Sequence, residues 1–260
     1  MIDLHNHLLW NIDDGSATVE ETTDHLRAAE EIGVVALVCT PHLYHPQYPA
    51  VTPGLIRERL ADCRRLLPAD SSLRLFSGAE HYFSEDFLRA IQRQEEIVSI
   101  NDGQYILLEF GPFFTMHGAD HMVRALRARG CTPLIAHPER HSYLNGHSAT
   151  LSRLMEQGCN FLMNSKSLTG RYGRQIQETA QRLLQMGFIH AIASDAHSAS
   201  GMRTHYPDAF AWTMEKWGRQ AAELLFLINP WLILHGLPTV PFFDEFALQQ
   251  TLKIHGVMDS

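Results

Sequence analysis

The feature that most constrains the fold of this chain is a repeated pattern in which a short apolar run ends at a histidine, aspartate or glutamate. Apolar runs of this length, bounded by turns, are typical of buried strands in parallel sheets. Because parallel strands can present their carboxyl ends on one face, we expect these polar residues to meet there. The residues at or just after the ends of the runs are His5, His7, His42, Glu80, Glu109, His137, Asp195 and His197.

Helical patterns lie between the apolar runs, and a glycine repeatedly follows the last helical turn. Strand and helix therefore alternate about seven times, which favours an α/β fold and, with ligands spread over the whole chain, a distorted (β/α)7 barrel of the TIM-like kind. The predicted helices are residues 19–32, 55–67, 85–94, 121–129, 148–157 and 174–186, followed by a longer one over 206–228.

The length of 260 residues fits one domain of this kind, residues 1–260, with a C-terminal cap of unassigned role from about residue 231. A formal net charge of −8 argues against nucleic acid as a partner. No apolar stretch approaches the roughly 20 residues that span a bilayer, and no basic leader begins the chain, so we expect no membrane insertion and a cytoplasmic protein.

Several of the strand-end residues suit a metal ion. His5 and His7 are two apart on an extended segment, so both side chains point to the same side. Asp13 and Asp14 follow on a turn, and the sequence leaves open which of them contributes a ligand. Glu109 follows an apolar run, and a carboxylate so placed is rarely buried unless it is paired or bound to metal.

Two further side chains indicate an anionic substrate. Arg140 follows His137 by three residues, and Arg203 lies beyond His197. Planar guanidinium groups match the oxygens of a phosphate. Asn164 and Ser165 end another apolar run and are better suited to orient ligands than to bind metal.

Seven short motifs, in order and with similar spacing, resemble those of the polymerase and histidinol phosphatase (PHP) family. The similarity runs from Met1 to about Pro230 and is greatest to the bacterial manganese-dependent protein-tyrosine phosphatases of capsule and exopolysaccharide operons. The motifs are His5-Asn6-His7, Asp13-Asp14-Gly15, Thr40-Pro41-His42, Gly78-Ala79-Glu80, Glu109-Phe110, Ala136-His137-Pro138-Glu139-Arg140 and Ser194-Asp195-Ala196-His197.

The resemblance implies a PHP-type barrel with three divalent metal ions, normally Mn²⁺, with iron or another divalent ion as substitutes. It implies His5, His7, Glu80 and Asp195 as the ligands of the first ion. It implies Glu80, Glu109 and His137 for the second ion, and Asp14, His42 and His197 for the third. Arg140 and Arg203 would hold the phosphate, and Asp13 would be a neighbour of the ligands.

The implied function is hydrolysis of phosphotyrosine by a metal-activated hydroxide, on the tail of a tyrosine kinase that regulates capsular or exopolysaccharide synthesis. The aromatic loop 42–48 could stack on the phenyl ring or form a lid. Alternatives are a small-metabolite phosphatase, such as one for histidinol phosphate, and a non-catalytic metal-binding scaffold. A homo-oligomer could form through the helix at 18–32 and through Phe113-Phe114.

Overall fold

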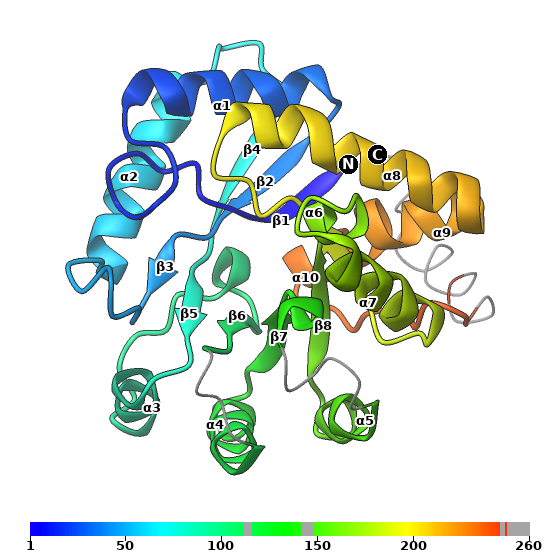
Figure 1. Ribbon diagram of the computed structural model, residues 1–260. Coiled ribbons are helices and arrows are strands. Elements are labelled where there is room, and N and C mark those ends of the chain that lie inside the picture. Colours follow the sequence, from blue (N-terminus) through cyan, green and yellow to red (C-terminus); the bar gives the residue numbers. More distant parts are fainter. Residues whose placement is uncertain (112–115, 142–147, 245–247, 249–260) are drawn as a thin grey trace.

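All nine strands of the computed structural model run parallel to the strands they pair with, in two sheets (Figure 1). The structure describes residues 1–111, 116–141, 148–244 and 248. The first sheet has the order β1-β2-β4 and the second β3-β5-β6-β7-β8-β9. The strands are β1 (Ile2–Asn6), β2 (Ala36–Cys39), β3 (His42–Leu43), β4 (Arg74–Ser77), β5 (Glu80–Tyr82), β6 (Tyr105–Glu109), β7 (Thr132–Ala136), β8 (Asn160–Asn164) and β9 (Ala191–Ala193).

The parallel α/β class predicted from the sequence is confirmed, whereas a closed barrel is not seen in the described part of the chain. Between β1 and β9 there is one isolated parallel bridge, Asn6 with Ala196, supported by a hydrogen bond from the Asp195 amide to the His5 carbonyl at 2.8 Å. The strands are thus arranged as two sheets that meet along this seam.

Two apolar runs that the sequence presents as single strands are each divided in the structure. Pro41 lies between β2 and β3, and proline cannot donate a hydrogen bond to a ladder. Gly78 lies between β4 and β5, where a Cβ atom would come within 2.7 Å of the Val38 side chain. These breaks raise the number of strands above the predicted seven and turn the ends of both runs toward the same face.

The predicted helices are present, with shifted ends. The helix predicted over 121–129 already begins at Met116, and the one predicted over 206–228 begins at Ala199 because the Ser198 hydroxyl caps it. Gly218, at φ +86°, ends α8. The helices are α1 (Val19–Glu31), α2 (Pro53–Leu66), α3 (Glu85–Gln92), α4 (Met116–Ala128), α5 (Ser148–Glu156), α6 (Ser165–Leu168), α7 (Arg174–Gln185), α8 (Ala199–Trp217), α9 (Arg219–Glu223) and α10 (Asn229–Leu234), with short turns η1 (Ile100–Asp102) and η2 (Pro138–Arg140) and a π-helix η3 (Leu224–Ile228).

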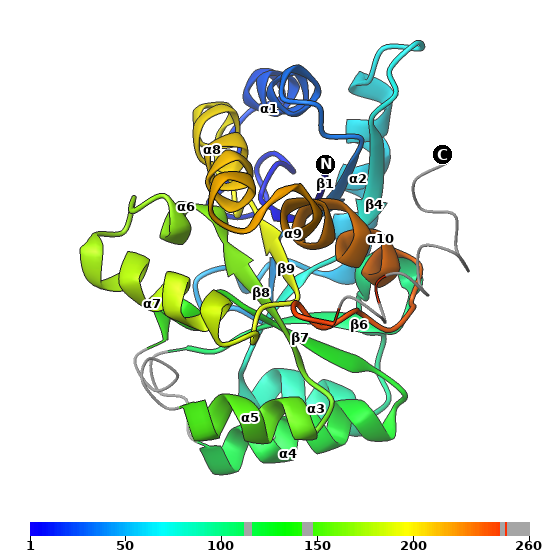
Figure 2. The same ribbon diagram turned by 90° about the vertical axis from the view of Figure 1, so that its right-hand side faces the viewer.

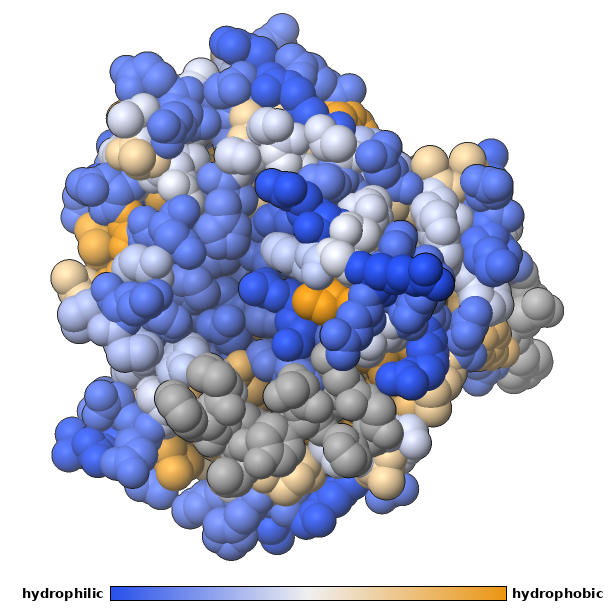
Figure 3. Space-filling model, in the orientation of Figure 1, coloured by the Kyte–Doolittle hydropathy of each residue, from blue (hydrophilic) through white to orange (hydrophobic). Residues whose placement is uncertain are grey.

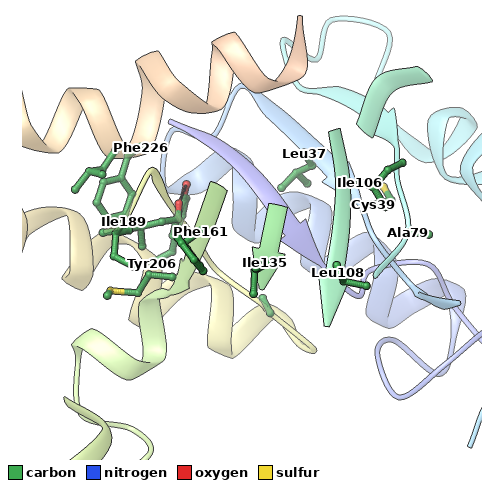
Figure 4. Close-up of a cluster of buried hydrophobic side chains, with 14 of the residues drawn as sticks. Leu37, Cys39, Ala79, Ile106, Leu108, Ile135, Phe161, Ile189, Tyr206 and Phe226 are labelled. Carbon is green, nitrogen blue, oxygen red and sulfur yellow. Dashed lines mark hydrogen bonds between the residues drawn. The ribbon is translucent and has the colours of Figure 1, made fainter. Parts of the chain in front are cut away.

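Both faces of the strands are buried, as expected for parallel sheets covered by helices. Figure 2 shows α3, α4 and α5 on one side of the strands and α1 and α8 on the opposite side. Side chains such as Leu37, Ile106, Ile135 and Phe161 form the core beneath the helices (Figure 4). The apolar face of α1 packs against α8 inside the chain, so it is not a free surface for an oligomer.

Residues on the other face of the strands form a second core that includes both sheets. Leu4 of β1, Val38 of β2, Leu107 of β6 and Leu134 of β7 all belong to it, together with Leu234 of α10. Helix α10 lies at the amino ends of the strands, where Asn229 donates to the His190 carbonyl at 2.8 Å just before β9. The carboxyl ends are left for the polar residues.

Candidate metal centre

The carboxyl ends of the strands bring the predicted ligands into one buried cluster. Glu80, at the start of β5, lies at its centre with 1% exposure. Its Oε1 lies 3.2 Å from Nε2 of His5 and 2.9 Å from Nε2 of His137. Its Oε2 lies 3.4 Å from Nε2 of His7 and 3.1 Å from Nδ1 of His42. One carboxylate therefore faces four imidazoles, an arrangement suited to bridging two cations.

Asp195 and Asp14 extend the cluster on either side of His197. Oδ1 of Asp195 lies 3.4 Å from Nε2 of His5 and 3.6 Å from Nδ1 of His197. Oδ1 of Asp14 lies 3.5 Å from Nε2 of His197 and 3.6 Å from Nε2 of His42. Potential ligand atoms lie within 4.8 Å of one another in the groups His7, Asp14, His42 and His197; His5, His7 and Glu80; His5, His137 and Asp195; His42, His45 and Glu109; and Glu80, Glu109 and His137.

Two of these residues have a left-handed backbone, which is uncommon for residues other than glycine. His137, after β7, has φ +36°, and Asp195, after β9, has φ +47°. Such conformations are costly and are retained mainly where the surrounding structure requires them, often at functional sites. Here the chain turns sharply as it leaves each strand, and both side chains face the cluster.

Neighbouring groups fix the orientation of two imidazoles. Nδ1 of His5 lies 2.6 Å from Thr40 Oγ1, and Nδ1 of His7 lies 2.7 Å from Oδ2 of Asp13. The same Asp13 oxygen accepts the backbone N–H of His42 at 3.0 Å. With Nδ1 engaged, Nε2 of His5 and of His7 is directed to the cluster, as is usual for metal-binding histidines.

Several atoms that face the cluster are buried and have no hydrogen-bond partner among the described residues. They are Nε2 of His5, Nε2 of His7, Nδ1 of His42 and Oε2 of Glu109. Unpartnered buried polar atoms are rare, because each one loses its hydration without compensation. Nitrogen and carboxylate atoms that converge in this way fit divalent transition-metal ions.

The electrostatics of the cluster also favour cations. Burial opposes the ionisation of Glu80, but His5 and His42 hold its pKa well below its usual range. Burial, followed by the negative charge of Glu80, raises the pKa of Glu109 to about 9. Without added positive charge, the two carboxylates therefore do not both ionise near neutral pH, whereas bound cations would favour their ionised forms.

Arg140 and Lys166 place positive charge on the opposite side of Asp195. Nη1 of Arg140 lies 3.2 Å from Oδ2 of Asp195, and its guanidinium lies 4.7 Å from the centre of the Tyr172 ring. Nζ of Lys166 donates to the main-chain oxygen of Asp195, and Asn164 Nδ2 donates to Oδ2. Asn164 therefore orients a predicted ligand, in agreement with the role suggested by its sequence position.

Arg203 is not brought to the cluster. Its Nη2 lies 2.8 Å from Oδ1 of Asp24, and its Nε lies 2.7 Å from Oε2 of Glu31, so it connects α8 to α1. On the same helix, the side chain of the preceding residue, Met202, is buried in the core. The structure thus gives no support to the prediction that Arg203 holds phosphate. Its position on α8 directs the guanidinium toward Asp24 and Glu31 of α1 and away from the cluster.

Lys166 and Tyr172 are site residues that sequence reasoning missed. Both line the pocket over the cluster, which has a volume of ≈ 390 Å³. The signal for Lys166 was its position two residues after the end of β8, which is comparable to the position of His137 after β7. Tyr172 lies on an irregular turn, and no periodic pattern marks it.

Further aromatic rings contact His42 and His45, which line the same pocket. The ring of Tyr48 stacks on His42 with centroids 5.4 Å apart and an angle of 7° between the planes. His45 lies between Tyr48 and Tyr82, with centroid distances of 5.2 Å and 4.6 Å. Gly111 provides the space that Tyr82 needs, because a Cβ there would overlap the phenol. Phe113 and Phe114, named as a possible interface, lie outside the described residues.

Comparison with known proteins gives a consistent assignment. The family described as capsular polysaccharide synthesis, CpsB/CapC, matches residues 1–235. The tyrosine-protein phosphatase YwqE of Bacillus subtilis is 30% identical over 226 residues, which cover 86% of this chain and 88% of the relative. The tyrosine-protein phosphatase CpsB of Streptococcus pneumoniae is 28% identical, with 88% of this chain and 96% of the relative covered.

Solved structures agree with these matches. A crystal structure from the work on YwqE of Bacillus subtilis and CpsB of Streptococcus pneumoniae, described as "unique metal-dependent tyrosine phosphatases", is similar to this chain. It superposes with a TM-score of 0.83 at 28% identity, and the match covers 93% of this chain and 97% of that one. The lactonase Lmo2620 of Listeria monocytogenes, with a TM-score of 0.52 and 11% identity, shares the fold alone. The resemblance inferred from the seven motifs is thereby confirmed.

Proposed function

Since this chain belongs to the capsular polysaccharide synthesis family CpsB/CapC, we propose that it is a metal-dependent phosphatase that hydrolyses phosphotyrosine in proteins. The observation that carries the proposal is the convergence of the nine predicted ligands in one cluster, beneath a pocket whose lining includes Arg140. Relatives at 28–30% identity over most of the chain are tyrosine-protein phosphatases.

Three divalent cations, most simply Mn²⁺, are proposed to bind the cluster. His5, His7, Glu80 and Asp195 would hold the first; Glu80, Glu109 and His137 the second; and Asp14, His42 and His197 the third. The last two sets coincide with or lie within groups of closely spaced ligand atoms. When bound, the ions would supply an activated water and neutralise charge on the phosphoryl oxygens.

The chain itself positions the phosphate. The guanidinium of Arg140 lies at the pocket wall, held by Asp195 and by the ring of Tyr172, so it can donate two parallel hydrogen bonds to phosphoryl oxygens. Lys166 adds a positive charge on the same wall. These donors meet the charge that develops on the phosphoryl group during displacement. A phenolate leaves readily, so phosphotyrosine needs little assistance from an acid.

The aromatic border supports an aryl substrate. Tyr48, His45 and Tyr82 present rings beside the ligands, and such rings can stack against a phenyl group. A metabolite without an aromatic group would not use this surface. The geometry therefore favours a phosphate ester with an aromatic ring, such as phosphotyrosine, and measured rates are needed to separate it from histidinol phosphate, whose imidazole is also aromatic.

The substrate protein is proposed to be the phosphorylated tail of a tyrosine kinase that controls capsule or exopolysaccharide synthesis, acting in the cytoplasm. The support for it is the described role of the family. In the described part of the chain, no helix is both long and apolar enough to cross a membrane. Assembly into a homo-oligomer stays a prediction.

The deciding experiment measures initial rates on a phosphotyrosine peptide, a phosphoserine peptide and histidinol phosphate, in metal-stripped protein with and without added Mn²⁺. Selective, Mn²⁺-dependent turnover of phosphotyrosine is expected. A preference for histidinol phosphate would mean that the site hydrolyses a small metabolite and not a phosphoprotein. Inactivity on all three substrates would instead favour a metal-binding scaffold.

A further inference from the structure

A second pocket of ≈ 530 Å³ adjoins the one over the metal-ligand cluster, and we call it the basic pocket. It lies between α6, the turn that follows it at residues 169–173, and the start of α8, and its lining includes Lys166, Arg171, Tyr172, Thr204 and His205. Lys166 and Tyr172 line both pockets, so the two spaces share a wall. A molecule bound at the cluster can therefore extend into the basic pocket.

The charges of the two pockets are opposite. Four of the residues around the cluster are carboxylates, whereas the lining of the basic pocket contains no aspartate or glutamate among the described residues. This lack is notable in a chain with a net charge of −8. Burial, and then the positive charges of Lys166 and Arg171, lower the pKa of His205. The basic pocket is therefore a local site of positive potential that would attract anions.

Arg171 is available to a ligand. Its side chain is exposed, and no carboxylate within ion-pair distance is found in the part of the chain that the structure describes. By contrast, the nearby Arg174 is paired with Glu178 at 2.7 Å. The backbone N–H of Arg171 donates to the Lys166 carbonyl at 2.9 Å, which fixes the turn between the two cations.

The backbone of the turn favours the conformation in which Arg171 and Tyr172 line the pocket opposite α8. Gly170 at φ +80° and Gly173 at φ +90° flank Arg171 and Tyr172, and such angles strain residues with a Cβ. Hydroxyl groups from Ser200 and Thr204 line the facing wall on α8. Figure 3 shows strongly hydrophilic side chains gathered over the region where Figure 1 places α6 and α7.

We propose that the basic pocket is a second subsite, which binds another anionic side chain of the peptide whose phosphotyrosine lies at the cluster. Arg171 would bind this carboxylate or phosphoester, with hydroxyl donors from α8 and with the positive charge of Lys166 on the shared wall. The inference rests on the proposed function and adds a substrate class: phosphotyrosine peptides with an acidic or phosphorylated residue within a few positions of the scissile group.

The test compares four phosphotyrosine peptides that differ at flanking positions on both sides. The flanks carry glutamate, glutamine, lysine or a non-hydrolysable phosphonate analogue of phosphotyrosine. For the Mn²⁺-loaded wild-type protein we expect kcat/KM to be about tenfold higher with an anionic flank than with glutamine, and lower with lysine. The preference should decrease as ionic strength rises.

Three variants locate the effect. Arg171→Gln should reduce the ratio of anionic to neutral peptides to about twofold or less, and Arg171→Lys should retain part of it. Arg174→Gln, an exposed arginine of the same segment outside the pocket, should leave the ratio unchanged. Each comparison is made within one variant, so differences in folding or metal content cancel.

The outcomes separate the two proposals. Turnover of the glutamine-flanked peptide tests the phosphatase activity alone, and its absence would refute the proposed function. Normal turnover with equal rates for all four peptides would refute the second subsite, as would a preference that persists in Arg171→Gln. A preference for glutamate alone or phosphonate alone would identify which anion the subsite accepts.

Discussion

The two ends of the strands solve opposite physical problems. At the amino ends, α10 places Ile233 and Leu234 in an apolar core with residues of both sheets. At the carboxyl ends, histidines and carboxylates are buried with unpartnered atoms, and two of them have a left-handed backbone. One end contributes stability, and the other concentrates groups that are unfavourable to bury. The difference indicates that the stability of this fold is generated away from its site.

Glu80→Gln gives the largest expected effect. The amide cannot bridge two cations or balance the four facing imidazoles, so kcat should fall by about a thousandfold or more. Turnover of a phosphotyrosine peptide, with metal content measured in the same samples, would show it. Glu215→Gln, at an exposed position of α8, is the matched control. A kcat within tenfold of the wild-type value would refute a central role of Glu80 in the site.

Leu234→Ala tests the other end. The side chain is 4% exposed in the second core, and its truncation should lower the free energy of unfolding by about 2–5 kcal/mol. Turnover per folded molecule should stay within about twofold at a temperature where the variant is folded, because α10 lies at the amino ends of the strands and the cluster at their carboxyl ends. Denaturant unfolding measures the stability. Leu237→Ala, at a half-buried position, should lower the free energy of unfolding by less. A large loss of kcat in folded Leu234→Ala would show that the two ends of the strands are coupled.

The raised pKa of Glu109 should make the metal-free protein lose stability as pH rises from about 4.5 toward 9. The pKa of Glu109 is raised from 4.5 to about 9, so near neutral pH the folded chain holds a proton that the unfolded chain has released. The raised pKa of His7 acts in the same direction. Measured between about pH 7 and 8.5, the loss from Glu109 alone should approach roughly 1.4 kcal/mol per pH unit, and His7 should steepen it.

Added Mn²⁺ should reduce this slope, because cations favour the ionised carboxylate. Denaturant unfolding at several pH values, with a chelator or with Mn²⁺, measures both conditions. A metal-free protein whose stability rises over this range would contradict the assigned protonation of Glu109.

Arg203→Gln should have the smallest effect. Its ion pairs with Asp24 and Glu31 lie at the surface, where such pairs contribute little, so stability should hardly change and kcat/KM should change by less than about threefold. Arg140→Gln, measured in parallel with a phosphotyrosine peptide, should lower kcat/KM by about a hundredfold. Comparable losses of kcat/KM in the two variants would indicate that Arg203 also binds the phosphate.

The proximity of the carboxyl-end residues could be predicted because each follows an apolar run, and parallel strands present these ends on one face. His5, Glu80 and Asp195 are recognisable in this way. Lys166 was missed because its charge follows a run that ends in neutral residues. The position of Arg203 could not be read from the sequence, because helix phase decides that its guanidinium contacts Glu31 of α1. The division of one run at Pro41 follows from the missing N–H of proline, whereas the division at Gly78 depends on a close contact with Val38 that no local pattern reveals.

The seam between the first and last strands has a consequence for the timing of assembly. Asp3 accepts hydrogen bonds from the backbone and side chain of Ser194, 191 residues later, at 2.8 and 2.7 Å. A ribosome adding about 5–20 residues per second needs roughly 10–40 s to span that interval. Until then His5 and His7 lack the partner strand that carries Asp195. We therefore expect metal capture to follow synthesis, so that ions available to the finished chain, rather than to the growing one, determine its content.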